Sequence, residues 1–127
     1  ETQTNSTDIT EATLMAEGDT FMEQGKIKEA ERAYLGAVSK NPKEPKLYNR
    51  LGAIYLKLHN YSDALQAFEA ARDLDGSKAS RHFNVALAAW QLGNLGKARE
   101  AIKQAMTLDP TAQKYQDLSA QIENGTA

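Results

Sequence analysis

Residues 47–76 read LYNRLGAIYLKLHNYSDALQAFEAARDLDG, and their hydrophobic spacing indicates two helices joined by a short turn. The first apolar set recurs at intervals of four, three and four residues: Leu47, Leu51, Ile54 and Leu58. A polar turn at His59–Asn60 separates it from the second set, which is Ala64, Ala67, Phe68 and Ala71. Because such intervals match the 3.6-residue turn of an α-helix, each set predicts one helix with a buried face. Gly76 follows the second set and is expected to end that helix in the left-handed conformation.

The same helix pair recurs along the chain at an interval typical of repeat architectures. Gly18, Gly52 and Ala86 are evenly spaced, at the period of roughly 34 residues that some helix-turn-helix repeats show. Three more triplets keep this interval: Ala30, Ala64 and Ala98; Tyr34, Phe68 and Ile102; and Ala37, Ala71 and Ala105. The small residues let two helices approach closely. The sequence therefore predicts three helix hairpins, in units of about 11–44, 45–78 and 79–112.

The N-terminal end departs from the repeat. Residues 1–9 are polar and lack hydrophobic periodicity, so we expect a linker or a disordered lead there. Asp8, with Glu11 three residues later, predicts a capping box at the start of the first helix.

The C-terminal end predicts a seventh helix. Its apolar stripe consists of Tyr115, Leu118 and Ile122. A helix over about residues 112–124 would cap the exposed flank of the third unit, as stacked repeats require. We therefore expect residues 10–127 to form a single all-α domain of seven helices.

Composition excludes several classes of function. The 127 residues carry 15 Lys and Arg against 17 Asp and Glu, a net charge of −2, and no Cys. Without Cys there is no disulfide, thiolate metal site or thiol nucleophile. Nucleic-acid-binding domains are normally strongly basic, so we expect no nucleic-acid partner. No apolar run approaches the roughly 18 residues of a membrane span, so we expect a soluble chain without membrane insertion.

Catalytic side chains are also scarce. The two histidines are His59, in a turn, and His82, at a helix-packing position, and no serine or carboxylate pattern accompanies them. We therefore expect a protein that is not an enzyme and uses no metal or cofactor. The chain begins with Glu1 rather than Met, which suggests a piece of something longer. Its location stays open between the cytoplasm and, after a removed signal or anchor, an extracytoplasmic compartment.

The middle unit resembles the tetratricopeptide repeat (TPR), a 34-residue helix-turn-helix. The matching positions are Tyr48, Leu51, Gly52, Tyr55, Ala64, Phe68 and Ala71. The other units match less fully. Glu17 replaces an apolar residue in the first unit, and the third unit has no aromatic residue at the positions where the repeat pattern has one. The resemblance implies a right-handed α-solenoid of antiparallel helix hairpins, with a concave groove lined by the first helix of each unit. It also implies a scaffold or adaptor that holds a peptide, a helix or another protein in that groove.

Candidate groove residues lie on the first helix of each unit, beside the stripe expected to be buried. They are Met15, Asp19, Met22, Lys46, Asn49, Arg50, Leu56, Lys57, Phe83, Asn84, Leu87 and Trp90. The apolar members would form a floor with the basic members beside it, which suits a peptide with apolar anchors and some acidic residues. Met adapts to ligands of different shape, and Trp and Arg often dominate binding energy.

Two alternatives apply to these residues. Phe83 and Trp90 could instead pack on the final helix, because aromatic residues at helical spacing are usually buried. Lys46, Arg50 and Lys57 could form an ordinary solvated polar face.

One familiar TPR subclass clamps the carboxylate end of heat-shock chaperones with Lys, Asn, Asn, Lys and Arg at defined groove positions. The corresponding positions here hold Met15, Asp19, Arg50, Ser80 and Asn84. None of the five matches, so this clamp is not expected.

The leading prediction is a protein–protein interaction module that binds a peptide or helix in the groove of a TPR superhelix. The alternative is a structural module that self-associates into a homo-oligomer through the first unit or the capping helix. The fold indicates the class of function, while the identity of the protein or peptide partner depends on the groove residues.

Overall fold

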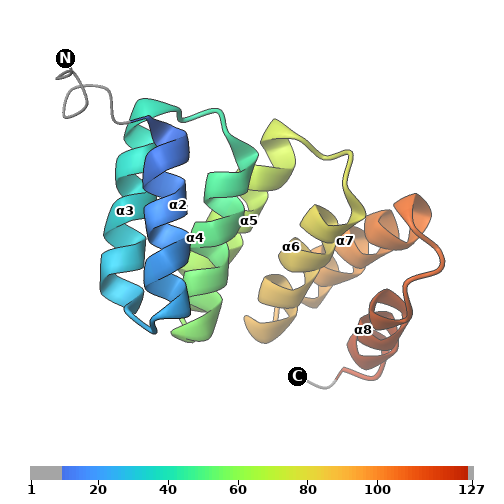
Figure 1. The fold of residues 1–127 in the computed structure, drawn as a ribbon. Coiled ribbons are helices and arrows are strands. Elements are labelled where there is room, and N and C mark those ends of the chain that lie inside the picture. The colour runs from blue at the N-terminus through green and yellow to red at the C-terminus, as the bar shows by residue number, and fades with distance from the viewer. Residues whose placement is uncertain (1–9, 126–127) are drawn as a thin grey trace, which may run out of the picture.

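The computed structural model describes residues 10–125, and these form seven helices and no strand (Figure 1). The helices are α2 (Glu11–Glu23), α3 (Ile27–Lys40), α4 (Pro45–Lys57), α5 (Tyr61–Leu74), α6 (Ala79–Gln91), α7 (Leu95–Leu108) and α8 (Gln113–Glu123). The prediction of an all-α solenoid with seven helices is confirmed. The linker predicted over residues 1–9 lies outside the described residues.

The helices pair as hairpins α2/α3, α4/α5 and α6/α7, which stand side by side from one end of the molecule to the other (Figure 1). The first helices begin at Glu11, Pro45 and Ala79, which are evenly spaced, and α8 keeps the same interval by beginning at Gln113. Helix α8 packs on α7 as α4 packs on α3. It therefore occupies the place of the first helix of a fourth unit.

Two equivalent contacts show that α8 keeps the repeat register. In the first pair of units, the Tyr55 hydroxyl of α4 donates to Glu31 Oε2 of α3 at 2.9 Å. The equivalent positions two units further along carry an ion pair between α7 and α8, Arg99 Nε to Glu123 Oε2 at 3.6 Å. Burial and the hydrogen bond to Glu31 raise the pKa of Tyr55 to about 12. The side chains differ, but the two helices meet at the same points because the backbone repeats.

A second repeated contact joins α4, α6 and α8 each to the loop before it. The Tyr48 hydroxyl donates to the Pro42 carbonyl at 2.7 Å, and the Gln116 amide donates to the Pro110 carbonyl at 3.0 Å. Between them in the series, His82 Nε2 lies 2.8 Å from the Gly76 carbonyl, which can only accept a hydrogen bond. His82 thus has a structural role at this position.

Two predictions about helix ends are wrong. The N-cap of α2 is Thr10, whose Oγ1 accepts from the Thr13 amide at 3.1 Å; Asp8, expected to cap this helix, lies outside the described residues. Gly76 does not adopt a positive φ. Helix α5 ends instead at an extended Asp75, whose carboxylate accepts from the Ser77 amide at 3.1 Å. An Asx turn of this kind reverses the chain without a left-handed residue.

The left-handed residues lie in the turns within the hairpins. Gly25, His59 and Gly93 occupy equivalent positions and have φ angles of 75°, 60° and 82°. A side chain at positive φ is strained, and glycine is not. The middle turn therefore carries strain that the other two avoid, although the His59 ring stacks on Tyr61 with centroids 5.8 Å apart.

Replacing His59 by Gly is expected to raise the free energy of unfolding by about 0.5–1 kcal/mol, because the left-handed strain is removed. The matched change in the third unit, Gly93→Ala, is expected to lower it by about 1 kcal/mol. No atom lies within 4 Å of a Cβ placed at Gly93, so steric overlap contributes nothing there. Urea unfolding followed by circular dichroism measures both. If Gly93→Ala leaves the free energy of unfolding unchanged, left-handed strain does not explain the use of glycine in these turns.

The core is divided between the hairpins. One cluster of buried side chains joins α3, α4 and α5, and a second joins α5, α6, α7 and α8. Tyr55 packs against both. In each of the first two units an aromatic ring of the second helix packs directly against a glycine of the first helix. These pairs are Tyr34 with Gly18 and Phe68 with Gly52. This division follows from stacking, since each unit buries its apolar face on its neighbours.

Candidate functional site

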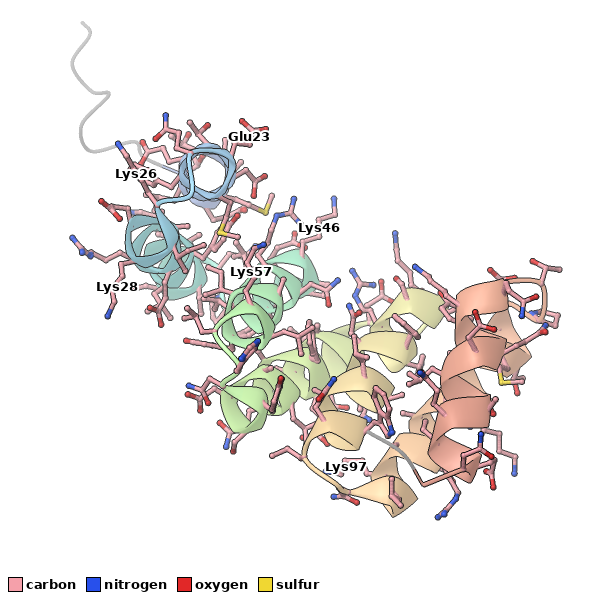
Figure 2. All side chains as sticks on the ribbon, turned by 90° about the horizontal axis from the view of Figure 1, so that it is seen from below. Glu23, Lys26, Lys28, Lys46, Lys57 and Lys97 are labelled. Atoms are coloured by element: carbon pink, nitrogen blue, oxygen red, sulfur yellow. The ribbon has the colours of Figure 1, made fainter. Side chains whose placement is uncertain are left out.

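Residues of α2, α4, α5 and α6 line a hollow of about 530 Å³. Its walls are Met22, Asn49, Arg50, Ala53, Leu56, Lys57, Phe68 and Asn84. Six of these were predicted as groove residues and come from α2, α4 and α6. Figure 2 views the stack from below and shows α2, α4 and α6 along one side of it and α3, α5 and α7 along the other. We call this hollow the groove.

Helix α4 runs along the groove and presents one polar stripe. Lys46, Arg50, Ala53 and Lys57 are spaced i, i+4, i+7 and i+11, so they share one face of the helix. Lys46, Ala53 and Lys57 are exposed, and Arg50 is partly buried. The stripe therefore has a lysine at each end, and Figure 2 labels both.

An ion pair occupies the middle of this stripe. Arg50 donates from Nε to Asp19 Oδ1 at 2.8 Å and from Nη2 to Asp19 Oδ2 at 3.3 Å. The hydroxyl of Tyr34 also donates to Asp19 Oδ1. Asp19 on α2 thereby connects α3 and α4. The bonds fix the positions of the Asp19 and Arg50 side chains, although both remain partly exposed.

The pKa values of the three groups follow from this contact. Burial alone would raise the pKa of Asp19, but hydrogen bonds from Arg50 and Tyr34, with the charge of Arg50, outweigh it and hold that pKa below its usual value. Burial and the bond to Asp19 raise the pKa of Tyr34. The bond to Asp19 also raises the pKa of Arg50. At neutral pH Asp19 is ionised and both of its donors are protonated.

The three basic residues of the predicted groove, Lys46, Arg50 and Lys57, consequently differ in whether an acidic side chain is paired with them. Arg50 forms an ion pair with Asp19, so its charge is compensated within the protein. Neither Lys46 nor Lys57 forms an ion pair within residues 10–125. Of these two lysines, Lys57 lines the groove, and Lys46 lies outside the lining on the same face of α4, one turn before Arg50.

Amide groups form the boundary between the second and third units. Asn84 of α6 donates from Nδ2 to Asn49 Oδ1 of α4 at 3.4 Å, a long hydrogen bond. Each amide can make up to four hydrogen bonds, so both retain donors and acceptors. Asn49 and Asn84 are partly buried and can bond a polar group placed in the groove.

The aromatic residues of α6 do not line this hollow. Trp90 is 8% exposed and lies in the core cluster with Tyr115, Leu118 and Ile122 of α8. The prediction that Trp90 lines an accessible groove is therefore wrong, because its side chain is buried in the cluster to which α8 contributes. The apolar stripe of α8 needed an apolar partner, and α6 supplies it together with α7.

Phe83 and Leu87 also lie against the cluster that holds α8. The Phe83 ring lies 5.1 Å from that of Tyr115, and the ammonium of Lys114 lies 5.2 Å from the Phe83 centroid. Both residues are partly buried, so α8 covers the α6 stripe only in part. At the other end of the stack, Met15 packs against the first core cluster and does not reach the hollow.

Two lining residues were absent from the predicted set. Ala53 is exposed between Arg50 and Lys57, and its small side chain leaves the hollow open. The i, i+4, i+7, i+11 spacing on α4 was the signal that places it there. Phe68 belongs to α5, so a search confined to the first helices could not find it.

A second hollow differs from the groove in the charges that line it. A larger hollow of about 600 Å³ lies between α7 and α8 and mixes Arg99 and Lys103 with Glu100 and Glu123. Among residues 10–125, no three His, Asp or Glu side chains are grouped so as to hold a metal ion. Over the same range, every helix is too short or too polar to traverse a bilayer.

Known proteins share both this sequence pattern and this architecture. The tetratricopeptide repeat model matches residues 15–79 and 50–113. Human tetratricopeptide repeat protein 21B is 32% identical over 108 residues, and Hsp70-Hsp90 organizing protein 1 of Glycine max is 27% identical over 100 residues. These alignments cover 85% and 79% of this chain but only 8% and 18% of the relatives.

A solved structure agrees at the level of the fold. The first TPR domain of Spaghetti (RPAP3), determined with a bound HSP90 peptide, has a TM-score of 0.83 and 21% sequence identity. The match covers 91% of this chain and 94% of that domain. The family model spans most of the chain, and the human relative is similar over most of the same residues. The chain therefore belongs to the tetratricopeptide repeat family.

Proposed function

We propose that this chain is a non-enzymatic protein-interaction module that binds a peptide segment of a partner protein in the groove. The observation that carries the proposal is that six predicted residues from three helices surround one open hollow. No feature of residues 10–125 favours the alternative, self-association into a homo-oligomer.

The relatives support peptide binding as the class of function. The first TPR domain of Spaghetti (RPAP3) was solved with an HSP90 peptide, and the second TPR domain of human RPAP3 with an HSP70 peptide. The soybean relative is named for organising Hsp70 and Hsp90. The chain differs from the chaperone-clamping subclass at Met15, Asp19, Arg50, Ser80 and Asn84. We therefore propose a peptide ligand without proposing the chaperone tail itself.

The lining indicates the chemistry of the ligand. Met22 of α2 and Leu56 of α4 supply partly buried apolar surface, and the thioether of Met22 adapts to ligands of different shape. Lys57 and Arg50 are the charged members of the lining, and no carboxylate is among them. An apolar anchor between α2 and α4, with acidic residues nearby, fits this surface.

Reversing the charge of Lys57 is expected to weaken binding of such a ligand about tenfold, because an exposed attraction becomes a repulsion. A ligand for the measurement is obtained by selecting peptides from a displayed library on the immobilised domain. The selected peptide is synthesised with a fluorophore and titrated with the protein, and its anisotropy is followed at two salt concentrations. Lys57→Glu is expected to lose affinity mainly at low salt.

Lys28→Glu is the matched control. Lys28 is exposed on α3, does not line the groove, and in Figure 2 points away from Lys46 and Lys57. The same change of net charge at this position is expected to alter affinity less than twofold at moderate salt. Equal losses for the two variants would show that net charge, and not the groove, governs binding, and the proposal would then be wrong.

A further inference from the structure

We infer that Asp19 determines the specificity of the groove. It is the internal counter-ion of Arg50, and because Arg50 is already occupied, the acidic groups of a bound segment are directed to Lys46 and Lys57. The inference rests on the proposed function and adds the arrangement of charge that the ligand must carry. It predicts an internal segment with two separated acidic positions, and disfavours one with its negative charge at the centre.

The first step is the engagement of Arg50 at the middle of the α4 stripe. Two of its N–H groups already bond Asp19, at 2.8 and 3.3 Å, in the paired geometry that suits a carboxylate. Tyr34 holds the same carboxylate from α3. A ligand carboxylate at this point would have to displace Asp19 or lie beside it, and either costs free energy.

The second step is the distance between the two lysines of α4 that have no ion pair among the described residues. Lys46 and Lys57 lie near opposite ends of one helix, separated by a rise of about 16 Å on the same face. An extended segment covers this distance in about five residues. Both lysines are exposed and without an ion pair among the described residues, so each can bond an acidic side chain at little desolvation cost.

The third step concerns what lies between the two lysines. The lining there includes Ala53, Leu56 and the amides of Asn49 and Asn84, all uncharged. The amides retain hydrogen-bonding capacity for the main chain of an extended segment. The partner class is thus a segment with two acidic side chains, spaced to reach both lysines and separated by uncharged and apolar residues.

Two synthetic peptides with blocked ends and the same composition test this charge arrangement. One, the end-spaced peptide, places two Glu about five residues apart with Leu between them, to match the span of an extended chain; the other, the centred peptide, places both Glu beside the Leu. Fluorescence anisotropy is expected to show about tenfold tighter binding of the end-spaced peptide to the natural chain. In Asp19→Asn, Arg50 is released, and the centred peptide is expected to bind about tenfold more tightly than before, which removes the preference.

Two control variants separate this role from a structural one. Tyr34→Phe removes the other bond to Asp19 but keeps its charge, and is expected to keep the preference. Arg50→Gln is also expected to keep it, because Arg50 does not bind the ligand in the natural chain. Circular dichroism confirms that each variant is folded.

The outcomes distinguish this inference from the proposed function. A preference that persists in Asp19→Asn, or disappears in Arg50→Gln, overturns the inference and leaves groove binding standing. Saturable binding of neither peptide to the natural chain would count against both.

Discussion

Gly52→Ala is expected to lower the free energy of unfolding by about 2–3 kcal/mol, although Ala is the better helix former by about 1 kcal/mol. A Cβ at this position would lie 2.4 Å from Cδ1 and Cε1 of Phe68. Phe68 is 2% exposed and packs in the second core cluster, so a shift of its ring away from the new methyl group would disturb that packing. Thermal and urea unfolding followed by circular dichroism measure the effect, which corresponds to a fall in Tm of about 10 °C.

A matched control keeps the chemical change and removes the overlap. Gly36 lies in helix α3, and a Cβ there would meet only Leu14 Cδ1, at an ordinary 3.5 Å. Gly36→Ala is expected to leave stability unchanged or raise it by up to about 1 kcal/mol. Equal destabilisation by the two substitutions would show that close approach is not the reason for Gly52.

The third unit suggests the compensating change. It carries Ala86 and Ile102 where the second carries Gly52 and Phe68, so a smaller side chain accompanies the added methyl group. Phe68→Ile in the Gly52→Ala background is expected to cost less than the sum of the single changes, with a coupling of about 1 kcal/mol or more. Strictly additive effects would contradict the pairing.

Ala53→Trp is expected to weaken peptide binding about a hundredfold, because an indole at this position fills the groove that the ligand's apolar anchor needs. Ala53 is exposed on α4 and lines the hollow of about 530 Å³. Its replacement leaves the buried side of the helix untouched, so we expect a small cost in stability, about 0.5 kcal/mol, from the lower helix propensity of Trp. Anisotropy titration with the selected, labelled peptide measures the loss.

Ala120→Trp provides the comparison for this substitution. Ala120 is exposed on α8 and does not line the groove, so the same increase in side-chain size is expected to leave affinity within twofold. Unfolding curves of the two variants should agree closely. Retention of full affinity by Ala53→Trp would place the binding surface elsewhere and contradict the proposed function.

The sequence was sufficient for the fold because the repeat interval was carried by many residues at once. Gly18, Gly52 and Ala86 each meet their partner helix where the interval predicted. The start of α8 at Gln113 also follows from the interval. Single local signals were less reliable: Gly76 does not end its helix in the left-handed conformation, because the Asp75 carboxylate makes the turn.

The candidate site was predictable only in part. Helical spacing placed Met22, Leu56 and Lys57 on one surface, and the structure brings them together. Spacing could not separate a stripe that lines a groove from one that receives another helix. Phe83 belongs to the second kind because its ring packs on Tyr115 of α8, a contact between residues distant in the sequence, and Trp90 is buried in the same cluster.

The sequence by itself determined the family, the number of helices and the residues that face one another within each hairpin, since these depend on short intervals that a repeating pattern records. Only the tertiary structure decided which polar side chains are paired and which aromatic ones are buried. Asp19 and Arg50 are far apart in the sequence, and their bond forms because two helices from different units lie side by side. Charge pairing and burial depend on such distances through space, so the contrast between Arg50 and the two lysines beside it became visible only in the folded chain.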